Sequence, residues 1–131
     1  MMKEHRESVL VVDDEEPVLD LLKAMLQDEY DVDCAKDADE ALRLVGGKEY
    51  DAVIADIALP GKLNGFELVE EISRVSPETK RILITGLALD EKSTKRAMAV
   101  ADGLLAKPFD MYEITSLLRK DLRLERMPHG A

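Results

Sequence analysis

The feature of this sequence that most constrains its fold is an alternation between short, largely apolar runs and longer segments with helical periodicity. The apolar runs have the length of strands, and they span residues 9–12, 32–35, 52–55, 81–84 and 103–106. After each run, apolar residues recur every three or four positions, as they do on one face of a helix. Strands that alternate with helices imply right-handed crossovers and a parallel sheet with helices on both faces.

The apolar positions of the five helical segments predict which residues face the core. They are Val18, Leu21, Leu22, Met25 and Leu26; Ala38, Ala41, Leu42 and Val45; Leu68, Val69, Ile72 and Val75; Ala97, Met98 and Ala101; and Ile114, Leu117, Leu118 and Leu122. Gly46-Gly47 and Ser76-Pro77 are expected to end the second and third helices. The fourth helix has the weakest apolar stripe. The strand at 32–35 is the least apolar and is expected at an edge of the sheet.

The run at 52–55 is apolar throughout, which is typical of a central strand covered on both faces. It is followed by Asp56, and the chain then breaks at Pro60-Gly61. Taken alone, Asp56 is explained equally well by a ligand-binding carboxylate at the end of a strand and by the start of a polar turn.

Several strands are followed by a chemically useful side chain. In a parallel sheet their C-terminal ends share one edge, where open α/β sheets bind ligands. The residues collected there are Asp13, Asp14, Asp56, Thr85 and Lys107. Each has an ordinary explanation by itself, such as a helix cap for Asp14 or Thr85. As a set they indicate a functional site.

Three carboxylates on one edge repel one another, and a hard divalent cation relieves that repulsion. Mg²⁺ prefers a few carboxylates, waters and a phosphate oxygen. A carboxylate can also accept a phosphoryl group, with Lys107 supplying positive charge and Thr85 a hydroxyl. No Gly-rich loop followed by Lys-Ser/Thr is present, so ATP is not expected as the direct donor.

Charge and length exclude several other classes of protein. The 131 residues suit one domain, and the net charge of −10 argues against nucleic acid as a direct ligand. No apolar run approaches the roughly 20 residues of a membrane helix. The polar N-terminal residues do not resemble a secretion signal, so a cytoplasmic location is expected.

Ordered motifs at these positions resemble the receiver domain of response regulators in bacterial two-component signalling (the CheY-like family). They are Val-Val-Asp13-Asp14-Glu15, Asp56-Ile-Ala-Leu-Pro60-Gly61, Asn64-Gly65-Phe66-Glu67, Ile84-Thr85-Gly86 and Ala106-Lys107-Pro108-Phe109. The resemblance covers residues 8–124 and leaves short tails at 1–7 and 125–131. It implies a flavodoxin-like (βα)5 three-layer sandwich, α/β in class, with a parallel five-stranded sheet in the order 2-1-3-4-5.

The resemblance also implies a role for each residue at the edge. Asp56 would accept a phosphoryl group from a histidine kinase or phosphotransfer protein. Asp14, Asp56 and the backbone carbonyl of Ala58 would ligate Mg²⁺ directly, and Asp13 would act through water. Lys107 would pair with the phosphoryl group, and its bond to Pro108 would be cis.

Thr85 would act as the switch that couples phosphorylation to a downstream protein or effector domain. By the same resemblance the chain is a phosphorelay protein, and its only chemistry is its own phosphoryl transfer and hydrolysis.

Two residues depart from the family pattern. Leu104 stands where the switch aromatic is usual, three residues before the lysine, and an aliphatic side chain cannot alternate between a solvated and a buried aromatic pose. Ala58 offers no side-chain amide or acid to position an attacking water. Slow self-dephosphorylation is therefore expected.

Two other functional hypotheses remain open from the sequence. One is a hydrolase with an aspartyl-phosphate intermediate, which would need a second acid close to Asp56. The other is a receiver fold that serves as a constitutive protein-binding scaffold.

Basic residues on the last two helices would suit an acidic partner or a homodimer, and equally a solvated face. They are Lys92, Lys95, Arg96, Arg119, Lys120, Arg123 and Arg126. Neither the cognate kinase nor the output partner is specified by the sequence.

Overall fold

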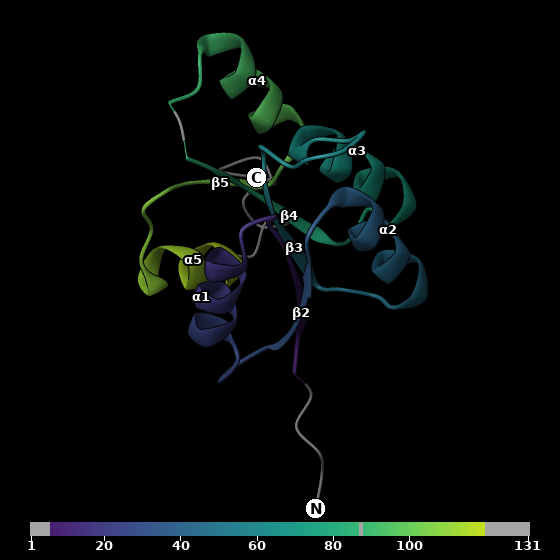
Figure 1. The fold of residues 1–131 in the computed structure, drawn as a ribbon, viewed down its shortest axis with the longest axis vertical. Coiled ribbons are helices and arrows are strands. Elements are labelled where there is room, and N and C mark those ends of the chain that lie inside the picture. The colour runs from purple at the N-terminus through teal and green to yellow at the C-terminus, as the bar shows by residue number, and fades with distance from the viewer. Residues whose placement is uncertain (1–5, 87, 120–131) are drawn as a thin grey trace, which may run out of the picture.

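The structure, a computed structural model, describes residues 6–86 and 88–119. Strands and helices alternate throughout this part of the chain. The strands are β1 (Ser8–Val12), β2 (Asp31–Ala35), β3 (Ala52–Asp56), β4 (Lys80–Thr85) and β5 (Gly103–Ala106). The helices are α1 (Glu16–Leu26), α2 (Ala38–Gly47), α3 (Gly65–Val75), α4 (Glu91–Val100) and α5 (Met111–Arg119). Figure 1 shows their arrangement.

All five strands are parallel and lie in the order β2-β1-β3-β4-β5. The flavodoxin-like order that the family resemblance implied is therefore confirmed. The apolar strand β3 is central, as expected, and the less apolar β2 is at an edge. The C-terminal ends of the strands meet at one edge of the sheet, because every strand runs in the same direction.

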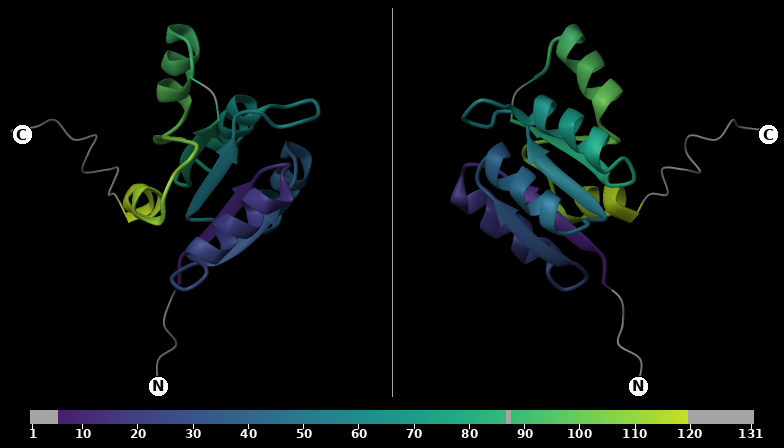
Figure 2. Two further views of the ribbon diagram at one scale, coloured as in Figure 1. Left: turned by 60° about the vertical axis from the view of Figure 1, so that its left-hand side comes forward. Right: turned by 90° about the vertical axis from the view of Figure 1, so that its right-hand side faces the viewer.

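Helices cover both faces of the sheet and bury a separate apolar cluster on each (Figures 1 and 2). Side chains alternate along a strand, so Val9 and Val11 of β1 pack with α1 and α5, whereas Leu10 and Val12 pack with α2 and α3. The three-layer arrangement fixes the sheet from both sides, and the edge that carries Asp56 is held in place by this core.

Three residues expected in the core are exposed instead: Leu21 at 48%, Val75 at 59% and Met98 at 71%. Each lies at the margin of its helical stripe, and because successive helical residues are about 100° apart a predicted stripe is easily too wide. In α4 only Ala97 is buried. Leu122, Lys120, Arg123, Arg126 and the expected domain boundary at 124 lie outside the described residues.

Four of the helices begin with a side-chain cap. Asp37 caps α2 and Asp90 caps α4, whereas Asn64 with Glu67 and Asp110 with Glu113 form reciprocal capping boxes at the starts of α3 and α5. The N-cap of α1 is Glu15, whose side chain makes no capping hydrogen bond. Since these helices follow the C-terminal ends of the preceding strands, their caps lie toward the edge of the sheet that carries Asp56.

Across residues 6–86 and 88–119 we find no helix with the length and apolar character needed to cross a membrane.

Candidate functional site

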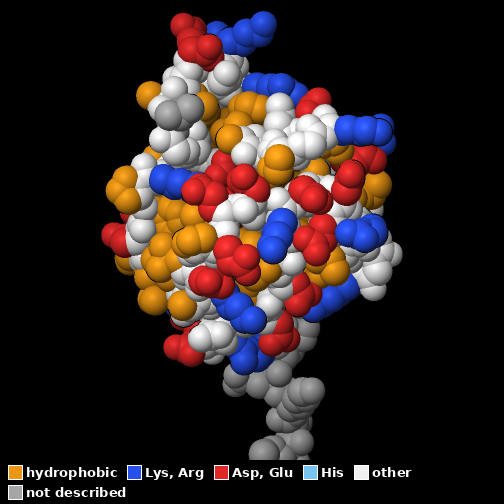
Figure 3. Space-filling view, viewed as in Figure 1, with side chains coloured by type: hydrophobic (Ala, Val, Ile, Leu, Met, Phe, Trp, Pro, Cys, Tyr) orange, Lys and Arg blue, Asp and Glu red, His pale blue; other side chains and the backbone are white. Residues whose placement is uncertain are grey.

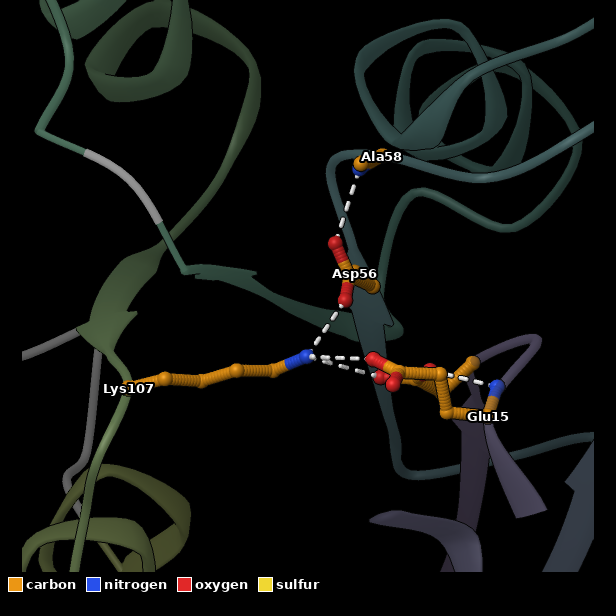
Figure 4. Close-up of polar contacts among 5 residues, drawn as sticks. Glu15, Asp56, Ala58 and Lys107 are labelled. Carbon is orange, nitrogen blue, oxygen red and sulfur yellow. Dashed lines mark hydrogen bonds and ion pairs between the residues drawn. The ribbon is translucent and has the colours of Figure 1, made fainter. Parts of the chain in front are cut away.

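Four side chains from three strand ends meet at one edge of the sheet. Asp13 follows β1, Glu15 is the N-cap of α1, Asp56 is the last residue of β3, and Lys107 follows β5. We call these four residues the rim cluster (Figure 4). Long-range packing of three parallel strands brings together residues that are up to 94 positions apart in the chain.

The ammonium group of Lys107 is shared among the three carboxylates. Its Nζ lies 2.7 Å from Asp56 Oδ2, 3.3 Å from Asp13 Oδ2 and 3.7 Å from Glu15 Oε1. The peptide bond between Lys107 and Pro108 is cis, as the family resemblance implied.

Backbone donors hold the other oxygen of each buried carboxylate. The Ala58 N–H donates to Asp56 Oδ1 at 2.8 Å, and the Glu15 N–H donates to Asp13 Oδ1 at 2.9 Å. Each carboxylate is therefore bound by an ammonium on one oxygen and by a backbone amide on the other. Such charge-assisted bonds on both oxygens fix the orientation of the group.

Burial and neighbouring charges shift the pKa values of Asp13 and Asp56 in opposite directions. Asp13 is fully buried and Asp56 is 5% exposed. Burial raises the pKa of Asp13 above its ordinary value, and the adjacent Asp56 adds to that rise. Burial also opposes ionisation of Asp56, but the bonds from Lys107 and from the Ala58 N–H outweigh it and hold the pKa of Asp56 below its ordinary value. Asp56 is thus an ionised carboxylate that is held in one orientation.

Burial tends to lower the pKa of Lys107, yet the hydrogen bond and charge of Asp56, reinforced by Asp13, raise that pKa above its ordinary value. Lys107 therefore stays protonated and provides a fixed positive charge beside Asp56.

The loop after Asp56 is built to hold the carboxylate in place. The Ile57 N–H donates to the Ile84 carbonyl at 2.9 Å, and the Gly65 N–H donates to the Ile57 carbonyl at 2.9 Å. Between them the chain turns at Gly61, whose φ of +95° favours glycine. The capped start of α3 is thereby tied to the backbone that carries Asp56.

The other predicted site residues have different surroundings. Thr85 is buried at the end of β4, and its carbonyl accepts the Lys107 N–H at 2.8 Å. Leu104 pairs with Leu83 in the sheet and packs, partly buried, against the core cluster that includes Ala97. Asp14 is exposed and outside the contacts of Lys107.

Glu15 was not predicted as a site residue, although it directly follows the two aspartates. Its backbone contact to Asp13 and its side-chain contact to Lys107 place it in the cluster. The sequence did offer a signal for it, because Glu15 is the third acidic residue in a row.

The donor set of the rim cluster fits a hard divalent cation. Two buried carboxylates share a single ammonium, and burial, with a smaller contribution from the adjacent Asp56, raises the pKa of Asp13. Oxygen donors at a partly open edge are those that Mg²⁺ prefers. No three acidic, His or Cys side chains of the described chain form a ready-made metal cluster. Direct ligation by Asp14 and by the Ala58 carbonyl stays a prediction.

Comparison with known proteins identifies close similarity over nearly the whole chain. Residues 9–119 match the response regulator receiver domain family. A signal receiver domain of an HD domain-containing protein from Pseudomonas fluorescens Pf-5 is 34% identical, with a TM-score of 0.83, covering 92% of this chain and 98% of that one. A CheY-like receiver domain protein from Methanospirillum hungatei JF-1 is 28% identical, with a TM-score of 0.84, covering 92% and 97%.

NtrX from Brucella abortus is 30% identical to this chain, with a TM-score of 0.81. The match covers 93% of this chain but only 29% of NtrX. A similar fold therefore occurs both in short receiver chains and as part of a longer protein.

Proposed function

Because this chain belongs to the response regulator receiver domain family, we propose that it accepts a phosphoryl group on Asp56 from a histidine kinase or phosphotransfer protein and thereby changes its binding to a downstream protein. The observation that carries the proposal is the Asp56 carboxylate, held between Lys107 Nζ at 2.7 Å and the Ala58 N–H at 2.8 Å. Receiver domains in general serve phosphorylation-regulated signalling.

In the proposed transfer, a carboxylate oxygen of Asp56 attacks the phosphorus of a phosphohistidine. The new P–O bond forms as the P–N bond breaks, and the imidazole leaves with the bonding electron pair. Lys107 is positioned to stabilise the equatorial phosphoryl oxygens. Phosphorylation would also replace the contact between Lys107 and the free carboxylate by one to a more highly charged group.

Asp14, Asp56 and the backbone carbonyl of Ala58 would hold Mg²⁺ directly, and Asp13 would act through water. When bound, the ion would neutralise negative charge on the carboxylates and on the incoming phosphoryl group. The buried carboxylate pair with its single ammonium supports this proposal.

Thr85 is the proposed switch, because its backbone is bonded to Lys107 and its buried side chain lies at the end of the strand next to Asp56. Leu104 packs, partly buried, against the core. This supports a Thr85 switch that works without an aromatic side chain at position 104.

Exposed apolar side chains support a protein partner. Leu21 of α1 and Met111 and Tyr112 of α5 are exposed, and Figure 3 shows hydrophobic side chains gathered over these two helices. By contrast, several basic residues are already paired within the chain: Lys95 with Glu91, Arg96 with Glu70 and Arg119 with Glu29. A homodimer through α4 and α5 would have to replace these pairs. We also propose a cytoplasmic location, because it suits a kinase partner.

Intact-protein mass after incubation with acetyl phosphate and Mg²⁺ tests the proposal. We expect one phosphoryl adduct that requires Mg²⁺ and is lost in Asp56→Asn. Asp51→Asn is the matched control and should keep the adduct, because Asp51 is exposed, precedes β3 at the end opposite Asp56 and accepts the Ser8 N–H at 2.7 Å. A folded protein that gains no adduct from acetyl phosphate or from a phosphorylated phosphotransfer protein would favour the constitutive scaffold.

A further inference from the structure

Glu15 occupies the N-cap of α1 but does not act as a cap. An N-cap side chain normally accepts a hydrogen bond from a backbone N–H in the first turn, as Asp37, Asn64 and Asp90 do in this chain. Glu15 makes no such bond. Its carboxylate lies instead 3.7 Å from Lys107 Nζ, while its N–H binds Asp13. The side chain therefore contributes to the rim cluster and not to the helix end.

Glu15 is also the outermost carboxylate of the cluster. Its side chain is 64% exposed, compared with 1% for Asp13 and 7% for Asp56. Figure 4 shows Glu15 and Asp56 approaching the same ammonium. Lys107 is the only cation in this cluster, so one positive charge faces three negative charges, and the excess negative charge lies on the solvent side of the acceptor.

We propose that Glu15 is a specificity-determining residue that disfavours small, highly charged phosphodonors at Asp56. The inference rests on the proposed function. A dianionic donor such as acetyl phosphate that binds beside Lys107 comes close to the Glu15 carboxylate, and a like charge beside a site lowers the local concentration of an anion. The chemical step is unaffected: the phosphorus forms a bond to an Asp56 oxygen, and acetate leaves with the electron pair of the broken P–O bond.

Because Glu15 is exposed, the repulsion is modest and is screened by salt. At saturating Mg²⁺ and low ionic strength, Glu15→Gln should be phosphorylated by acetyl phosphate about two- to fivefold faster than the wild type. The gain should shrink toward onefold at an ionic strength of about 1 M, where the Debye length is roughly 3 Å. Phosphoramidate, which carries less negative charge at neutral pH, should show a smaller gain than acetyl phosphate.

Glu16→Gln is the matched control, because Glu16 is the next residue, is exposed and pairs with Lys36 at 3.4 Å. It should leave the rate unchanged. Glu15→Asp retains the negative charge, can cap the helix and should keep the low rate of the wild type.

Three outcomes would overturn the inference: a wild-type rate in Glu15→Gln at low salt, an equal gain at all salt concentrations, or a gain in Glu15→Asp as large as that in Glu15→Gln. Failure of every variant and of the wild type to form an adduct, with any donor, would count against the proposed function instead.

Discussion

Gly65 lies directly against the main chain of Asp56. A Cβ atom at position 65 would be 2.8 Å from the Asp56 carbonyl carbon and 2.6 Å from the Ile57 Cα, and it would overlap the Asp56 carbonyl oxygen. Real side-chain atoms do not come that close to a rigid backbone. The start of α3 can therefore pack against the end of β3 only because residue 65 has no side chain.

Gly65→Ala should both destabilise the protein and impair phosphorylation. We expect a loss of about 1–3 kcal/mol in the free energy of unfolding, typical of overpacking, and a rate of adduct formation at least roughly tenfold lower, because Asp56 is displaced. Gly46→Ala is the control: nothing lies within 4 Å of the position that a methyl group would take there, and alanine should add about 0.5–1 kcal/mol of helix stability. Denaturant unfolding and adduct formation measure both effects, and wild-type values for Gly65→Ala would contradict this interpretation.

The exposed Ala58 lies beside Asp56, the proposed acceptor, since its own N–H binds the Asp56 carboxylate. Asn at this position could hydrogen-bond a water near the phosphoryl group. Ala58→Asn should shorten the phosphoryl half-life by about two- to tenfold, the effect of one added hydrogen bond. Ala58→Val, which adds volume without a polar group, should not shorten it. Equal half-lives in the wild type and the Asn variant would sink the idea.

Arg81 ties the C-terminal end of α4 to the sheet. Its Nε donates to the Val100 carbonyl at 3.2 Å, its backbone N–H donates to Asp102 Oδ2 at 2.9 Å, and its guanidinium lies 3.8 Å from the same carboxylate. The two side chains are only 12% and 4% exposed. Arg81→Ala would leave Asp102 buried without this cation and should cost about 3 kcal/mol in the free energy of unfolding.

The matched control for Arg81 is Arg74→Ala. Arg74 makes a shorter ion pair of 2.8 Å with Glu71, but its side chain is 73% exposed. Solvent screening should limit its cost to less than about 1 kcal/mol. Chemical denaturation of both variants compares them, and a larger loss in Arg74→Ala would show that distance matters here more than burial.

Tyr50 bonds to Asp33 across the edge strand, with its Oη 2.6 Å from Asp33 Oδ2. This bond, aided by Lys48, lowers the pKa of Asp33 below its ordinary value of 3.8. A depressed carboxyl pKa stabilises the folded state above the unfolded pKa, and that stabilisation is lost as the pH falls through the lower folded pKa. Tyr50→Phe should therefore cost about 1 kcal/mol at pH 7, a modest figure because Asp33 is partly exposed.

The cost of Tyr50→Phe should decrease once the pH falls below 3.8, and NMR titration should show a higher pKa for Asp33 in the variant. Tyr112→Phe is the control, because Tyr112 is 78% exposed, and it should change neither quantity. A cost for Tyr50→Phe that does not depend on pH would disprove the charge-assisted bond.

Local patterns were enough to predict the elements of the fold. The β-branched runs and helical stripes predicted each strand and helix between residues 8 and 119, because period and composition act over a few neighbouring residues. The same patterns placed Asp13, Asp56, Thr85 and Lys107 at one edge of the sheet. The strand order came from family resemblance, since a parallel alternation is compatible with several orders.

Only the tertiary structure decided how these residues meet. Asp13, Asp14 and Glu15 are consecutive acidic residues that the sequence does not distinguish. In the structure Asp13 is buried, Asp14 is exposed outside the rim cluster, and Glu15, at the N-cap of α1, contacts Lys107. The contact of Gly65 with Asp56 and the anchoring of α4 by Arg81 likewise depend on segments far apart in the chain. Periodicity fixes which face a residue occupies within its own element, whereas burial, charge sharing and close backbone approach are set by how the elements pack against one another.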